Sequence, residues 1–388
     1  MFVRIVRGEG ARVWDDQGHE YIDALASLWY CSVGHGRTEV VAAVTRQMET
    51  LEAFHTFDRF TNEPADELCR QLAALAPMGD PRVFLTSGGS ESVDTAIKVA
   101  RRAQAAAGHP ERTIVISRAP SYHGVTYGAV SATGLPLNQE GFGPFVGDMV
   151  QVPHDSLEAM AAVFARSPER VAAILAEPVV GAGGVLPPAP GYLRGLRELC
   201  DHHGAYLILD EVICGFGRVG SWWAAERYGV EPDLVTFAKA VTSGYLPLGG
   251  VLVGRSVLEP LEADPSLMLR HGYTYSGHPT ACAAALAVLE IMRREDLVGR
   301  AELIGRQLES GLAGLAKEGT IAAYRGVGAV WAAVLPAGRD PVVVRDRMLD
   351  EGVIARPLGP DVIAFCPPLV ISTAEVDRCM EALAVAVR

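Results

Sequence analysis

Features of several common protein classes are missing from this chain of 388 residues. It has no long uninterrupted apolar stretch, so the sequence predicts no transmembrane helix and no association with a membrane. The first residues lack the apolar core of a signal peptide. Acidic residues outnumber basic residues by 46 to 34, which leaves a net charge of −12. This balance argues against nucleic acid as a main partner, because phosphate binding needs a basic face.

The cysteines are arranged neither as a disulfide framework nor as a metal site. There are seven, an odd number, and none belongs to a Cys-x-x-Cys pair. They are spread through apolar segments, where cysteine behaves as a small hydrophobic residue. The pattern indicates reduced thiols in a cytoplasmic protein, and we expect no bound metal.

Lysine is scarce, which makes each lysine informative. Only Lys98, Lys239 and Lys317 are present among 34 basic residues. Lys98 and Lys317 fall in stretches with helical spacing and are expected to be solvated. Lys239 instead follows a short apolar run, and burying a lysine without a role would be costly. A perturbed lysine can be catalytic or can pair with an acid for structural reasons, and both readings remain open here.

Two short apolar runs each end in a charged side chain. Residues 205–210 end in Asp210, and residues 234–238 deliver Lys239. Their length and their content of Leu, Ile and Val are typical of buried strands in a parallel sheet. Ligands of open α/β sheets bind at this edge. A buried acid and a lysine on neighbouring strands suit pyridoxal phosphate, because the lysine forms an imine and the acid keeps the pyridine nitrogen protonated.

Strands and helices alternate through the middle of the chain, which indicates a mostly parallel sheet with helices on both faces. Residues 3–23 read as a β-meander, and the chain after residue 279 reads as an α+β tail. In that tail we expect a strand over 325–334 and a final helix over 373–387. The expected strands of the sheet are 82–86, 113–117, 171–176, 205–210, 234–238 and 248–254.

Residues 87–92, Ser-Gly-Gly-Ser-Glu-Ser, lie between a strand and a helix. Free N–H groups and the positive end of a helix at such a turn can bind phosphate, although ordinary turn chemistry gives similar sequences. Tyr122 follows the next strand. Its ring could stack on a flat cofactor, or it could pack in the core as most lone tyrosines do.

Taken together, the motifs resemble those of the class III (ω-amino-group) aminotransferases, which have the type I pyridoxal phosphate fold. The order and spacing of the pieces agree over nearly the whole chain. The matching pieces are the motif at 87–92, Tyr-His-Gly at 122–124, Glu-Pro at 177–178, Asp-Glu-Val at 210–212, Gly-Phe-Gly-Arg at 215–218, Lys239, and Thr-Tyr-Ser-Gly-His-Pro at 274–279.

The resemblance implies a role for each matching residue. Lys239 is the Schiff-base lysine and moves the substrate proton, and Asp210 is the partner of the pyridine nitrogen. Tyr122 and Val212 flank the cofactor ring. Thr274 reaches the phosphate bound in a second subunit, so the implied active form is a homodimer with shared active sites. The other implied cofactor contacts are Gly89, Ser90 and His123.

The fold implied by the resemblance is α/β, with a mostly parallel seven-stranded sheet in a large domain. The small domain is α+β and is built from both chain ends. We expect the large domain over residues 48–280 and the small domain over residues 1–47 and 281–388. Members of the family usually have a longer segment before the meander, so we expect either a more open active-site entrance here or a native N-terminus that lies upstream.

Four positions bear on the substrate. Ornithine- and GABA-type members carry a gating glutamate where this chain has Ala182. Other motifs are similar to ω-amino acid:pyruvate and amine:pyruvate transaminases, in which an arginine near the C-terminus binds the carboxylate of the keto acid. Arg356 is at the matching place, and a guanidinium suits a carboxylate. The implied substrate-binding residues are Trp29, Phe57 and Arg356.

The expected reaction moves an amino group from a primary amine or ω-amino acid to a keto acid such as pyruvate. It is ping-pong and passes through pyridoxamine phosphate. Alternatives within the fold are a diaminopelargonate synthase, an aminomutase and a dialkylglycine decarboxylase. Alternatives from other classes are a dehydrogenase that binds a dinucleotide at residues 87–92, although this loop lacks Gly-x-Gly-x-x-Gly, and a catalytically silent cofactor-binding protein.

Overall fold

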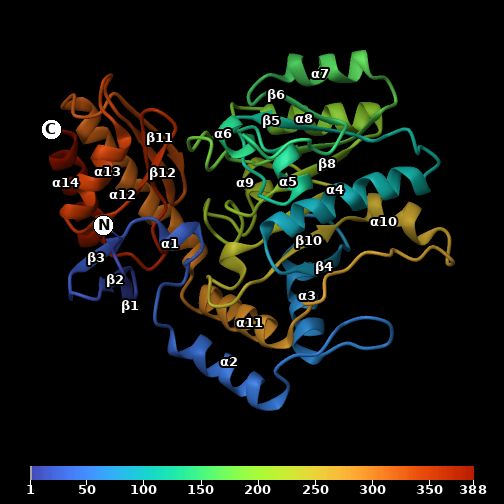
Figure 1. The fold of residues 1–388 in the computed structure, drawn as a ribbon, viewed down its shortest axis with the longest axis horizontal. Helices are drawn as coiled ribbons and strands as arrows, with labels where there is room; N and C mark the ends of the chain where they lie inside the picture. The colour runs from blue at the N-terminus through green and yellow to red at the C-terminus, as the bar shows by residue number, and fades with distance from the viewer. Residues whose placement is uncertain (1) are drawn as a thin grey trace.

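A seven-stranded sheet forms the centre of the larger of two bodies (Figure 1). The computed structural model describes residues 2–388. The strand order is β4-β10-β9-β8-β7-β5-β6, and only β10 runs antiparallel to both of its neighbours. The mostly parallel seven-stranded sheet is thereby confirmed. Its strands are β4 (Arg82–Thr86), β5 (Ile114–Ala119), β6 (Met149–Pro153), β7 (Val171–Ala176), β8 (Tyr206–Asp210), β9 (Leu234–Phe237) and β10 (Gly249–Val253).

Alternate residues of the central strands fill two cores, one on each face of this sheet. In β7, Ala173 and Leu175 join the core under α4, α5 and α10. Ile174 and Ala176 join the other core, which α3, α7 and α8 also fill. The period of two is why a strand buried on both faces reads as a continuous apolar run. These helices are α3 (Glu63–Leu75), α4 (Gly89–Ala106), α5 (Tyr127–Ala132), α7 (Leu157–Arg166), α8 (Tyr192–His203) and α10 (Arg255–Glu262).

The smaller body combines both chain ends, as Figure 1 shows by the blue and red segments lying together. Its first sheet, β1-β2-β3-β13, joins the N-terminal meander to β13 through parallel pairing of Ile22 with Val353. Its second sheet has the order β11-β12-β15-β14. The strands are β1 (Ile5–Glu9), β2 (Arg12–Asp15), β3 (Glu20–Asp23), β11 (Ala323–Val327), β12 (Val330–Val334), β13 (Val353–Ile354), β14 (Arg356–Leu358) and β15 (Val362–Phe365); the helices are α12 (Leu297–Lys317), α13 (Pro341–Asp350) and α14 (Thr373–Val387).

Two helices connect the bodies. α2 (Thr38–Thr50) packs against α11 (Pro279–Arg294). The expected domain boundaries at 47/48 and 280/281 fall inside these two helices. The division into 1–47, 48–280 and 281–388 therefore remains a proposal. The short helices α1 (Ala26–Trp29), α6 (Pro136–Gln139) and α9 (Ala224–Tyr228) belong to connecting loops.

Two expectations about strands need correction. Residues 325–334 form a hairpin of β11 and β12 rather than one strand, and Gly328 at the turn has a φ of 51°. β6 is absent from the expected strands, and as an edge strand it pairs only with β5. Across residues 2–388, no helix combines the length and apolar composition that a bilayer span requires.

Candidate active site

A cavity of about 510 Å³ lies where the carboxyl ends of the central strands meet the smaller body. Asp210 ends β8, Lys239 follows β9, and Tyr122 lies in the loop after β5. The smaller body contributes Trp29 and Arg356. The cavity thus combines nine of the eleven residues predicted for the site: Trp29, Gly89, Ser90, Tyr122, His123, Asp210, Val212, Lys239 and Arg356.

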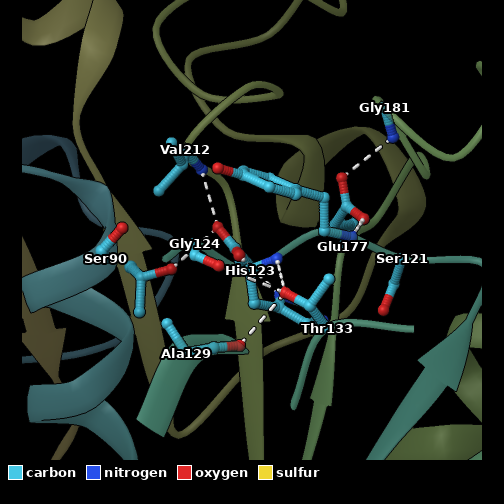
Figure 2. A network of polar contacts seen from close by, with 12 residues as sticks. Ser90, Ser121, His123, Gly124, Ala129, Thr133, Glu177, Gly181 and Val212 are labelled. Carbon is cyan, nitrogen blue, oxygen red and sulfur yellow. Dashed lines mark hydrogen bonds and ion pairs between the residues drawn. The ribbon is translucent and has the colours of Figure 1, made fainter. Parts of the chain in front are cut away.

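The Asp210 carboxylate accepts three hydrogen bonds, and two of the donor residues, His123 and Val212, are labelled in Figure 2. Oδ1 accepts from Val212 N at 3.1 Å and from Thr236 Oγ1 at 3.0 Å. Oδ2 is 2.7 Å from His123 Nδ1, which donates because a carboxylate only accepts. Asp210 is only 4% exposed. The bonds fix the orientation of the carboxylate at the cavity wall.

Lys239 lies at the first residue of a single 3₁₀ turn and has a φ of 48°. This conformation is uncommon for a residue with a β-carbon and marks the position as constrained. Burial lowers the pKa of the Lys239 amine, and the negative charges of Asp210 and Glu177 oppose that effect. Lys98 and Lys317 are exposed, as predicted. Lys239 therefore lies in an environment that favours a neutral amine.

The first turn of α4 has the features of an anion-binding site. Its N-cap residue, Gly88, has no side chain to occupy the free N–H groups of Gly89 and Ser90. The 18-residue helix also places the positive end of its dipole at the cavity. A β-carbon at position 89 would lie 3.1 Å from Val212 Cγ1, so a glycine suits this close approach. Ser90 Oγ accepts from Val125 N at 3.0 Å, which holds the loop after β5 against the helix.

Glu177 joins two loops of the cavity. Its Oε1 accepts from Tyr122 N at 3.0 Å, and its Oε2 accepts from Gly181 N at 2.9 Å. Burial raises the pKa of this carboxyl, while His123 and the two N–H donors oppose the rise. Glu177 thereby fixes both the tyrosine loop and the Gly-rich loop that contains Ala182.

The sequence indicates no role for Glu177 or Thr236, although both side chains support the site. Glu177 belongs to the Glu-Pro motif at 177–178, which matches the family but by itself predicts no chemical function for the glutamate. Thr236 was marked only by being the polar residue of an otherwise apolar run, and its hydroxyl turned out to bond Asp210. Cavity-lining residues 135–138 were also missed, because they belong to no regular pattern.

Arg356 lines the cavity from the smaller body. Its guanidinium makes no hydrogen bond or ion pair with any residue of the described range 2–388. Burial already lowers the pKa of Lys239, and the charge of Arg356 lowers it further. Ala182 and the buried Trp29 line the same cavity. An arginine that is free of protein carboxylates can bind a carboxylate from solution.

Two predicted residues, Phe57 and Thr274, do not line the cavity of their own chain. Both belong to exposed loops that lie side by side, because Thr56 Oγ1 donates to Ser276 O at 3.0 Å. Phe57 is 40% exposed and packs near Gly272, and Thr274 is exposed. Their expected roles stay predictions, and both could act only at a cavity of another chain.

The residues present fit pyridoxal phosphate. Free N–H groups at the start of α4 suit its phosphate, and the Asp210 carboxylate suits a protonated ring nitrogen. Tyr122 and Val212 offer two flat or apolar walls, and Lys239 provides an amine of lowered pKa. Four chemically different groups therefore converge on one cavity in the way that this cofactor requires.

Comparisons with known proteins agree with this geometry. The family model for aminotransferase class-III matches residues 1–387. The putrescine–pyruvate aminotransferase of Pseudomonas aeruginosa is 36% identical, with 99% of this chain and 91% of that protein covered. A transaminase structure from Virgibacillus superposes with a TM-score of 0.96 at 37% identity, covering 100% of this chain and 93% of that one.

A further solved structure bears on the cofactor. It is an amine transaminase from an uncultivated Pseudomonas species, in the PLP-bound form. It superposes with a TM-score of 0.95 at 35% identity and covers 100% of this chain and 94% of that one. These matches remove the dehydrogenase alternative. The chain belongs to the class-III aminotransferases and is a transaminase that uses pyridoxal phosphate.

Proposed function

We propose that this transaminase moves an amino group from a primary amine or ω-amino acid to a keto acid, with pyruvate as the preferred acceptor. The observation that carries the proposal is the free guanidinium of Arg356 in the cavity of Lys239. A bidentate pair with arginine gives a keto acid both affinity and orientation. The similarity to a putrescine–pyruvate aminotransferase supports the same donor and acceptor classes.

Each residue of the site has a physical task in this reaction. When bound, pyridoxal phosphate supplies the electrophilic carbon and the electron sink. The N–H groups of Gly89 and Ser90 hold the phosphate. The Asp210 carboxylate keeps a proton on the ring nitrogen. The neutral Nζ of Lys239 accepts the proton from the substrate Cα and returns it, because its lowered pKa leaves a lone pair available.

We also propose a homodimer in which the exposed loops complete the neighbouring cavity. Aromatic side chains at these loops are unusually exposed for their size, namely Phe54, Phe57, Phe60 and Tyr275. A contiguous exposed apolar surface is typical of an interface. Thr274, on the same surface, would then reach the partner's phosphate. Sedimentation should give the mass of a dimer, and a monomer with full activity would contradict the proposal.

A cytoplasmic location belongs to the same proposal. All seven cysteines are free thiols, and six of them are buried. Disulfides are rare in reducing compartments, so free thiols support this assignment.

The decisive experiment is a panel of donors and acceptors with the purified protein and added cofactor. A diamine or ω-amino acid should give alanine from pyruvate, and the visible absorption of the cofactor should change on adding the amine alone. Product formation without a keto acid would indicate an aminomutase. Release of carbon dioxide would indicate a decarboxylase, and acceptor selectivity would reveal a diaminopelargonate synthase.

A further inference from the structure

Arg218, the last residue of the Gly-Phe-Gly-Arg motif, is a buried cation without an acidic partner. Its side chain is only 1% exposed, and within residues 2–388 it forms no salt bridge. Its Nη1 donates to Pro367 O at 2.7 Å and to Ala329 O at 3.3 Å, and its Nη2 donates to Ser32 Oγ at 3.4 Å. Burying a charge without a counter-ion costs free energy. The position of this buried guanidinium therefore needs an explanation.

All three acceptors belong to the smaller body, whereas Arg218 belongs to the larger one. Ser32 comes from the N-terminal segment, Ala329 from the turn between β11 and β12, and Pro367 from the chain after β15. The backbone adds to the junction, because Ala329 N donates to Arg218 O at 2.9 Å. One side chain therefore holds together segments from both chain ends and the larger body.

These acceptors lie next to the substrate-binding residues. Ser32 is three positions after Trp29. Pro367 follows β15, and Ala364 of that strand pairs with Arg356. Displacement of either acceptor would move the wall of the cavity that is expected to bind the keto acid.

The loop that carries Arg218 is itself tied to the strand that delivers Lys239. Phe216 packs edge-on against Phe237 of β9, with ring centroids 5.9 Å apart. Phe216 N donates to Trp222 O at 2.6 Å, and Gly217 N donates to Ser221 O at 3.1 Å. Phe216 and Gly217 both have positive φ, at 56° and 85°. The loop is thus closed on itself and anchored two residues before Lys239.

We propose that Arg218 is a positioning residue that sets the distance and orientation of the Arg356 and Trp29 wall relative to Lys239. The cofactor-binding residues of this chain, from Gly89 to Lys239, all lie in the larger body, and within residues 2–388 the Arg218 side chain forms no hydrogen bond with any of them. A guanidinium suits this task because its planar fork reaches acceptors in several directions at once. The proposal rests on the assignment of Arg356 to the substrate carboxylate in the proposed function.

The test uses the holoenzyme with Arg218→Lys, Arg218→Met and Ser32→Ala. Lysine keeps the charge without the fork, methionine removes both, and Ser32→Ala removes one acceptor and no charge. We expect kcat/KM for pyruvate to fall about 10- to 100-fold in Arg218→Met, mainly through KM, because a misplacement near 1 Å has effects of this size. Smaller losses in the same direction are expected for the other two variants. The dissociation constant of the cofactor should stay within about twofold of the parent, since no cofactor contact changes.

A second acceptor separates positioning from general destabilisation. A simple aldehyde has no carboxylate, so its KM should change less than that of pyruvate. The matched control is Arg227→Met. Arg227 donates to Val219 O at 2.8 Å and pairs with Glu302 of α12, so it joins the same loop to the smaller body away from the cavity. It should lower the melting temperature without changing the KM for pyruvate.

The outcomes can be told apart. Equal losses for pyruvate and the aldehyde, or a lower melting temperature with unchanged KM, would overturn the role of Arg218. If Arg218→Met does not fold, Arg218→Lys decides by the same criteria. Arg356→Met is the reference variant. If Arg356→Met leaves the KM for pyruvate unchanged, the assignment of Arg356 to the substrate carboxylate fails. If Arg356→Met raises this KM but the Arg218 variants do not, only the proposal for Arg218 fails.

Discussion

The His123 ring and the Asp210 carboxylate form a buried pair, with Nδ1 and Oδ2 2.7 Å apart. His123 Nε2 has no hydrogen-bond partner among the described residues 2–388. The bond therefore fixes the tautomer, with the proton on Nδ1, and directs the carboxylate toward the cavity. Removing the His123 donor should therefore make the orientation of the Asp210 carboxylate, which the cofactor ring requires, less well defined.

His123→Phe should lower kcat about tenfold, as expected for the loss of one hydrogen bond to a charged group. Asp210→Asn should cost more, because it removes the charge itself. In a double-mutant cycle the two losses should be far from additive, since both variants break the same bond. Full additivity, measured by steady-state kinetics, would show that the pair does not act as a unit.

Lys239→Ala should reduce kcat by about 10³-fold or more, because it removes both the covalent anchor of the cofactor and the group that moves the substrate proton. Circular dichroism should show an unchanged fold. Lys317→Ala, at an exposed lysine, is the control and should be fully active. Near-normal transamination by Lys239→Ala would refute the assignment.

The lowered pKa of Lys239 can be measured directly on the protein without cofactor. Burial disfavours the ammonium form, so Lys239 should become reactive toward an amine-acylating reagent at a lower pH than an ordinary lysine with a pKa of 10.5. Only three lysines are present, so mass spectrometry can follow each one separately. Asp210→Asn should move the midpoint for Lys239 to still lower pH, because it removes a charge that favours the ammonium form. An upward movement would contradict the described electrostatics.

Ala182→Glu should introduce a carboxylate into the cavity that contains Arg356. Pairing of the two groups would compete with the keto acid, so we expect the KM for pyruvate to rise about tenfold, equivalent to about 1.4 kcal/mol. Ala182→Gln has nearly the same shape without the charge and should change this KM much less. Equal effects of the two substitutions would point to steric blocking rather than to ion pairing.

Protonation of His35 should make the free energy of unfolding depend on pH. Burial alone would lower its pKa, but the hydrogen bond to Asp23 and the neighbouring Cys31 raise the pKa of His35 to about 10. A raised folded-state pKa means that the folded protein binds the proton more tightly than the unfolded chain. The stabilisation is therefore complete below about pH 6.5 and is lost as the pH rises toward 10.

The check is urea unfolding of the parent and of His35→Gln across this pH range. The difference in the free energy of unfolding should be largest below pH 6.5 and should shrink as the pH rises toward 10. A constant difference would show that His35 does not titrate as described. The 2.8 Å bond between His35 Nε2 and Asp23 Oδ2 would then contribute independently of the proton.

The sequence by itself was sufficient for the elements whose cause is local. Asp210 and Lys239 could be placed at strand ends because an apolar run of four to six residues is a local signal. The helix at 373–387 is preceded by its N-cap Ser372, which forms a capping box with Glu375, and both partners are close in the chain. The roles of Gly89 and Tyr122 followed from motif order, and the structure places both at the cavity.

Tertiary structure decided everything that depends on distant segments. β6 has a weak local pattern, and within residues 2–388 β5 is the one strand with which it pairs. The bonds from Thr236 and His123 to Asp210 join residues 26 and 87 positions apart. The Arg218 junction unites Ser32, Ala329 and Pro367, which no sequence spacing relates. The periodicity of apolar residues indicates which face of one segment is buried. The side chains that meet across the cavity are instead determined by how the two bodies pack together.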